Sequence, residues 1–115
     1  MHEFPITQQI IKIAEEHARS NNASKVTKIA LVVGEMSGFI GDSISMYFDI
    51  ISKGSLTEGA VLDIKYVKPK LKCEKCGEYF ERKRFSFECP DCGGQGVPTE
   101  IGKEFYIESI EVEDN

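Results

Sequence analysis

The sequence has no apolar run long enough to cross a membrane. Uncharged stretches such as "IALVVG" and "MSGFIG" fall far short of the roughly 20 residues that a spanning helix needs. No basic segment followed by an apolar one opens the chain, which argues against a secretory leader. A glycine-rich phosphate loop is also missing, so any nucleotide hydrolysis would have to come from a partner. No nucleophile or acid/base pair stands out, and we therefore expect a protein that is not an enzyme.

Acidic residues outnumber basic ones. The chain has 14 Lys and Arg against 19 Asp and Glu, a net charge of −5, which argues against a general affinity for nucleic acid. The charge is unevenly placed, because residues 68–96 carry seven basic and five acidic side chains while the remainder carries seven and fourteen. This asymmetry indicates two units with different surfaces.

The first half of the chain predicts a helix, a strand and a second helix. Apolar residues with helical spacing follow Pro5, which suits a first helical turn, and "SNNAS" ends the pattern; they are Ile6, Ile10, Ile13, Ala14 and Ala18, with His17 at the edge. "VTKIALVVG" is rich in β-branched residues and predicts a strand over 26–34. After a glycine-punctuated loop, Asp42 or Ser43 is expected to cap a second helix.

The second half predicts two strands separated by an insert. "AVLDIKYV" alternates apolar and polar residues over 60–67, and "EFYIESIEVE" over 104–113 slips in register between Ile107 and Ile110, which favours a bulge. Because both strands flank the insert, we expect them to pair with each other and to carry the insert at their tips.

The insert between the last two predicted strands contains two CxxCG units. Cys73 and Cys76, then Cys89 and Cys92, can each place two thiolates on one tight turn, with a glycine following in the left-handed conformation. Two such turns facing each other close a tetrahedral four-sulfur site. Without a secretory leader these cysteines are expected to be reduced cytoplasmic thiols, so metal ligation is favoured over disulfides.

The identity of this metal stays open from spacing alone. Four thiolates leave no open coordination position, which indicates a structural Zn(II) site rather than a catalytic one. Iron in a rubredoxin-like site uses similar turns, and the geometry does not exclude it. A redox CxxC pair is disfavoured, because two such pairs lie within twenty residues of each other.

The N-terminal tripeptide Met1-His2-Glu3 is a second candidate metal site. The Met1 amine, the His2 amide and the His2 imidazole would form a five-membered and a six-membered chelate ring, a planar nitrogen set that suits Ni(II) or Cu(II). Glu3 could add its amide or its carboxylate. Pro5 would start the helix late enough to leave all three residues available. The alternative is an ordinary loose terminus with a histidine at position 2 by chance.

Taken together, "MHE" before an amphipathic helix, "VVGEMSG", "FDIISKGSLTEGAVLDI" and the CxxCG…CPxCG module resemble the HypA/HybF hydrogenase nickel-incorporation proteins. The resemblance runs from Met1 to the last strand. It implies an α+β fold, a three-stranded sheet with two helices plus an inserted zinc-ribbon-like module, with a nickel-binding domain over 1–67 and 100–115 and a zinc module over 68–99.

The resemblance also implies a function. The chain would be a nickel metallochaperone that binds Ni(II) at Met1, His2 and Glu3, with structural zinc on Cys73, Cys76, Cys89 and Cys92. Its partners would be the GTPase HypB and the [NiFe]-hydrogenase large-subunit precursor, and in some members a urease accessory protein. A monomer or weak homodimer is expected, without membrane or nucleic-acid partners. Some members carry a histidine near the end of the zinc module, but this chain has Pro98 and no histidine after His17.

A competing interpretation is a zinc ribbon that binds nucleic acid or another protein. The locally basic "KPKLK" and "ERKRF", with Phe and Tyr nearby, favour it. The simpler explanation is a solvated basic face around an anionic thiolate site.

Overall fold

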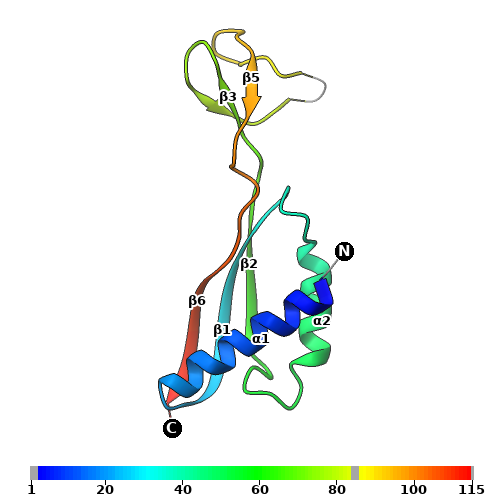
Figure 1. Cartoon of the computed structure of the whole chain (residues 1–115), viewed down its shortest axis with the longest axis vertical. Helices are drawn as coiled ribbons and strands as arrows, with labels where there is room; N and C mark the ends of the chain where they lie inside the picture. The colour runs from blue at the N-terminus through cyan, green and yellow to red at the C-terminus, as the bar shows by residue number, and fades with distance from the viewer. Residues whose placement is uncertain (1–2, 84–85, 115) are drawn as a thin grey trace.

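The chain folds into two small sheets that lie at opposite ends of an elongated molecule of 57 × 26 × 16 Å (Figure 1). The computed structural model describes residues 3–83 and 86–114. Along the chain, helix, strand, helix and strand precede the small sheet, and a long strand follows it. The predicted α+β class, with two helices, a three-stranded sheet and a small cysteine module, is confirmed.

β1 (Ala23–Gly34) is the central strand of the larger sheet. β2 (Val61–Val67) pairs with it in parallel on one edge, and β6 (Phe105–Asp114) pairs with it antiparallel on the other. The prediction that the two strands flanking the insert pair with each other is therefore wrong. The reason lies in β1, which is the longest and most apolar strand and is buried on both faces from Ile29 onward.

The register places one apolar row of each strand on the same face. Ile29, Leu31 and Val33 of β1 stand beside apolar residues of both neighbours, which include Leu62, Ile64, Ile107 and Ile110. Ala30 pairs with Ser109 while Leu31 pairs with Ile107, so Glu108 is left over. The predicted bulge between Ile107 and Ile110 is thus confirmed.

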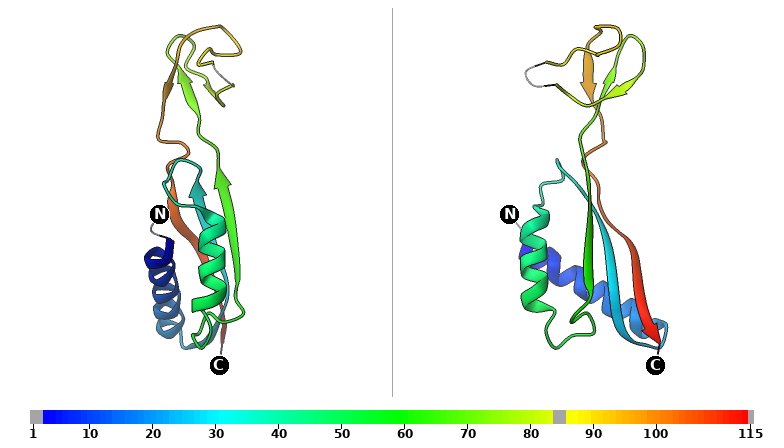
Figure 2. Two further views of the ribbon diagram at one scale, coloured as in Figure 1. Left: turned by 90° about the vertical axis from the view of Figure 1, so that its right-hand side faces the viewer. Right: turned by 180° about the vertical axis from the view of Figure 1, so that it is seen from behind.

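Both helices cover this apolar face (Figure 2). α1 (Glu3–Ser20) buries the side chains of Thr7, Ile10, Ile11, Ala14 and Ala18 against the sheet and α2. The prediction that Ile13 and His17 belong to this face is wrong, because Ile13 is 41% exposed and His17 is exposed. Thr7 is buried instead because its hydroxyl donates to the Glu3 carbonyl within the helix, which satisfies the polar group.

The two helix starts also differ from the sequence prediction. α1 begins at Glu3 rather than at Pro5, so Glu3 is part of its first turn. α2 (Gly41–Ile51) has Ile40 at its N-cap and no side-chain cap, so the predicted cap by Asp42 or Ser43 is wrong. Glu3 of α1 instead contacts this end of α2, as described below.

A narrow neck joins the two sheets, and glycines allow its chains to approach closely. The Gly34 N–H donates to the Glu104 carbonyl at 2.6 Å, and the Met36 N–H donates to the Gly102 carbonyl at 2.7 Å. A Cβ on Gly34 would collide with the Gly102 carbonyl oxygen, and Gly102 itself has a φ of +103°. The end of β1 is thereby fastened to the chain that returns from the small sheet.

The small sheet has the order β4-β3-β5, with β3 (Leu71–Cys73) in the centre, β4 (Tyr79–Phe80) and β5 (Gly96–Pro98). Both outer strands are antiparallel to β3. Its core consists of Leu71, Cys73, Phe80 and Cys89. Two of these four side chains are cysteines, so the metal-ligand candidates are also half of the core.

Candidate metal centres

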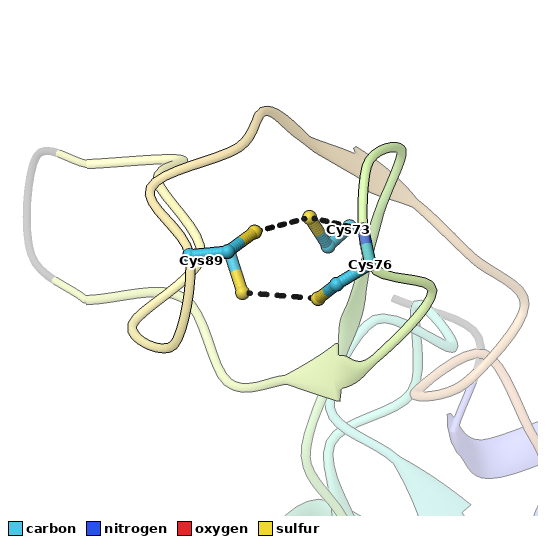
Figure 3. A group of neighbouring side chains, drawn as sticks. Cys73, Cys76 and Cys89 are labelled. Carbon is cyan, nitrogen blue, oxygen red and sulfur yellow. Dashed lines mark hydrogen bonds between the residues drawn. The ribbon is translucent and has the colours of Figure 1, made fainter.

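The structure brings the four cysteines together. All four Sγ atoms lie within 4.8 Å of one another, with Cys73 and Cys92 at 3.4 Å and Cys76 and Cys89 at 3.7 Å. Figure 3 shows Cys73 at the end of β3 and Cys76 on the turn that follows, facing Cys89 on the second turn. These separations are too long for a disulfide bond of about 2.05 Å. The cysteines are free thiols gathered at one point.

The two CxxC turns have the same backbone hydrogen bonds. The Gly77 N–H donates to the Cys73 carbonyl at 3.0 Å, and the Gly93 N–H donates to the Cys89 carbonyl at 2.9 Å. Both glycines have positive φ, +79° and +76°. The predicted left-handed glycine after each CxxC is confirmed, and it closes each turn tightly enough to point two sulfurs the same way.

Backbone amides also surround the first sulfur. The N–H groups of Lys75 and Cys76 each donate to Cys73 Sγ at 3.4 Å. A Cβ on Gly94 would come within 2.8 Å of the same sulfur, so glycine is needed there for the second turn to approach the first. Cys73 and Cys89 are buried, while Cys76 and Cys92 are exposed.

This arrangement separates the acidities of the thiols. The N–H of Cys76, followed by that of Lys75 and the sulfur of Cys92, lowers the pKa of Cys73 to about 6. The hydrogen bond from the Glu78 backbone lowers the pKa of Cys76, but partial desolvation and the sulfurs of Cys73, Cys92 and Cys89 outweigh it and raise this pKa to about 12. One thiolate therefore forms easily, and the next ionises only when a cation offsets the accumulating charge.

The donor set fits a tetrahedral metal ion. A tetrahedron with a Zn–S bond of about 2.3 Å has sulfur–sulfur edges of about 3.8 Å, close to the two distances found here. Within residues 3–83 and 86–114, no histidine or carboxylate joins the four sulfurs. The four sulfurs are therefore suited to hold an ion with no open coordination position. Among nearby aromatic residues, Phe80 is buried in the same cluster as Cys73 and Cys89, whereas Tyr79 and Phe87 are exposed.

The predicted nickel ligands Met1 and His2 lie outside the described residues. Glu3 is described and is 7% exposed. Its Oε2 accepts a hydrogen bond from the Ile40 N–H at 3.0 Å, at the positive end of α2. No sequence pattern indicates this contact, because the two residues are 37 positions apart and Ile40 contributes only its backbone.

A family model described as "Hydrogenase/urease nickel incorporation, metallochaperone, hypA" matches residues 1–112. The chain belongs to the HypA family. Three relatives named hydrogenase maturation factor HypA support this. They are from Caldanaerobacter subterraneus, 48% identical over 98% of this chain and 100% of its own, Dehalococcoides mccartyi, 39% over 99% and 96%, and Aquifex aeolicus, 34% over 98% and 98%.

Solved structures of the HypA family have the same fold. The solution structure of the Ni metallochaperone HypA from Helicobacter pylori aligns with a TM-score of 0.65 at 28% identity, covering the whole of both chains. A second HypA solution structure aligns with a TM-score of 0.70 at 28% identity, covering all of this chain and 98% of its own. The resemblance inferred from the sequence motifs is thus confirmed.

Membership of the HypA family makes this chain a metallochaperone of hydrogenase/urease nickel incorporation, and that description names maturation rather than catalysis. None of the helices in the described part of the chain is long and apolar enough to span a membrane. Within residues 3–83 and 86–114, the four cysteines are the group of metal-ligating side chains that the structure of this HypA-family chain brings together.

Proposed function

We propose that the chain carries Ni(II) at its N-terminus, on the Met1 amine, the His2 amide and imidazole and the backbone amide nitrogen of Glu3. Nickel is the cargo rather than a resident cofactor. The observation that carries the proposal is the HypA family match, which begins at residue 1 and so includes the tripeptide. An amine, amides and an imidazole in sequence form a planar nitrogen set, which suits Ni(II).

The position of Glu3 supports an amide rather than a carboxylate donor. Its Oε2 is engaged with the Ile40 N–H, and the side chain is buried. Its amide belongs to the first position of α1, where a helix makes no use of the N–H in its own hydrogen-bond ladder.

The test is a Ni(II) titration of the zinc-loaded protein by calorimetry. His2→Ala should lose the tight site, while His17→Ala, which removes the exposed second histidine on α1, should bind like the unchanged chain. Because binding displaces protons from nitrogen, the affinity should fall as the pH is lowered. Equal nickel affinity in His2→Ala and the unchanged protein would refute the N-terminal site.

A chain extended by one residue before Met1 isolates the amine. The extension moves the charged amine away and leaves His2 unchanged. X-ray absorption at the nickel edge should then show a different ligand set in the extended form. An identical spectrum for both forms would remove the amine from the proposed site.

We propose that the four cysteines hold a structural Zn(II), and that residues 68–99 form a domain of their own against 1–67 and 100–115. Four sulfur donors with no open position support a structural zinc ion that stabilises a small core. Iron is the alternative. A purified protein that is colourless and contains zinc by elemental analysis supports zinc, whereas a red protein with visible charge-transfer bands supports iron.

The partners we propose follow from the HypA family. They are the [NiFe]-hydrogenase large-subunit precursor and the maturation GTPase HypB, with a urease accessory protein as a further recipient, all in the cytoplasm. The family description names both hydrogenase and urease. Co-purification of the zinc-loaded chain with each candidate, with and without nickel, tests each pairing separately.

A further inference from the structure

An apolar pocket lies beside the neck, at the base of the small sheet. Its volume is about 220 Å³. Side chains from separate segments form its walls: Met36 follows β1, Leu71 belongs to β3, Phe87 lies on the loop between β4 and β5, and Ile101 lies on the chain returning to β6. None of these residues belongs to the four-cysteine site or to the N-terminal tripeptide.

The rim of this pocket is basic in an otherwise acidic protein. Lys70, Arg82 and Lys103 line it, and no Asp or Glu lines it among the described residues. Lys103 pairs with Glu100 at 3.7 Å. Lys70 and Arg82 form no ion pair within residues 3–83 and 86–114. Lys70 of "KPKLK" and Arg82 of "ERKRF" thus meet at one apolar pocket.

The Arg82 side chain lies over an aromatic ring. Its guanidinium carbon lies 4.3 Å from the centre of the Phe87 ring. A guanidinium stacked on a ring still directs its N–H groups outward along its edge, where a carboxylate can accept two hydrogen bonds. The stacking also holds Phe87 as one wall of the pocket, although that ring is 43% exposed.

We propose that this pocket binds an acidic segment of a partner protein, with one apolar side chain in the pocket and its carboxylates on Lys70 and Arg82. The pocket is smaller than the roughly 300–1,000 Å³ of small-molecule sites, which favours a single side chain. The apolar floor disfavours a nucleic-acid backbone, which has no aliphatic side chain to place there. The proposal does not depend on nickel binding at the N-terminus.

The pocket requires both halves of the molecule. Met36 is fastened to Gly102 by a hydrogen bond between their backbones, and Leu71 and Phe87 come from the cysteine module. Loss of order in that module would remove two of the walls. Binding at the pocket should therefore require the zinc-loaded protein.

The experiment uses NMR of the zinc-loaded full chain and a synthetic probe, acetyl-Glu-Glu-Leu-Glu-Glu-amide. Saturable shift changes should appear at the pocket residues and weaken with added salt. The same peptide with glycine in place of leucine, and one with lysines in place of glutamates, should bind far more weakly. Lys70→Glu should weaken binding of the leucine peptide by roughly tenfold, since reversal replaces an attraction with a repulsion.

Lys12→Glu is the matched control, because it makes the same change in net charge on an exposed position of α1. It should bind the peptide like the unchanged chain. The proposal fails if the leucine peptide gives no saturable change at the pocket, if the glycine peptide binds equally well, or if Lys12→Glu and Lys70→Glu weaken binding alike. It also fails if a single-stranded oligonucleotide binds this pocket more tightly than the peptide.

Discussion

The Glu3 carboxylate accepts a hydrogen bond from the Ile40 backbone N–H at 3.0 Å, and so joins the first turn of α1 to the N-cap of α2. In a capping box, a glutamate three residues into the helix satisfies the N-cap N–H. In α2 that position is Ser43, and Glu3 of another helix takes over this role. The residue proposed to present nickel with its amide thus uses its side chain to fix the two helix ends together.

Replacing Glu3 should therefore destabilise the fold as well as the nickel end. Glu3→Ala leaves the N-cap amide of α2 without this acceptor, and we expect a loss of about 1–2 kcal/mol in the free energy of unfolding. Glu3→Gln keeps an acceptor oxygen and should lose less. Urea denaturation of the zinc-loaded variants measures both. A change in Glu3→Ala within about 0.5 kcal/mol, as for an ordinary surface substitution, would contradict the capping role.

Gly34→Ala should disrupt the neck. The added Cβ would meet the Gly102 carbonyl and the Glu104 amide, both backbone groups that no side-chain rotation can move away. We expect a loss of more than about 2 kcal/mol in unfolding free energy. Gly38→Ala is the control, because its Cβ meets nothing and costs only the strain of a positive φ, about 1–2 kcal/mol. Equal losses in the two variants would show that the close approach at Gly34 is unimportant.

Lys28→Ala should hardly change stability, although Lys28 lies near two carboxylates. Its Nζ is 3.7 Å from Asp63 and 3.9 Å from Glu111, on the sheet face away from the helices. All three side chains are more than a third exposed, so water and salt screen the pairs, and we expect a change below about 1 kcal/mol. Thermal unfolding at low and high salt tests this; a loss that is large and independent of salt would contradict it.

The elements that the sequence predicted correctly depend on local chemistry. The β-branched run of β1, the alternation in β2 and the positive-φ glycines after each CxxC are properties of a few adjacent residues. The slip in the pattern of β6 likewise marked the bulge at Glu108 without reference to any other strand.

The predictions that proved wrong depend on contacts between distant segments. The positions of β2 and β6 on either side of the insert predict that they pair with each other. Both pair with β1 instead, because β1 is apolar and buried and takes the centre of the sheet. The first residue of α1, Glu3, and the uncapped N-terminus of α2 meet in the Glu3–Ile40 hydrogen bond. Neither residue is a cap signal in its own segment.

Zinc removal should unfold the small sheet and leave the larger one intact. The core of the small sheet is Leu71, Cys73, Phe80 and Cys89, and its strands are two or three residues long, so without metal it buries too little to stay ordered. The larger core contains no cysteine among its described residues. Under a chelator, amide hydrogen exchange should become fast in the small sheet while β1 stays protected, and added zinc should restore protection.

The same removal should be easier at low pH. The metal binds cysteines as thiolates rather than as thiols. In the metal-free protein the pKa of Cys73 is lowered to about 6, while that of Cys76 is raised to about 12. Between these values binding releases protons, so affinity rises with pH and falls on acidification. Zinc loss to a fixed chelator should therefore be greater at pH values near the lower end of this range than at mildly alkaline pH.

In the hydrogen-exchange experiment, one result would contradict separate unfolding of the small sheet. If β1 loses protection together with the small sheet when zinc is removed, the two sheets form one cooperative unit, and zinc then stabilises the whole fold rather than its smaller half.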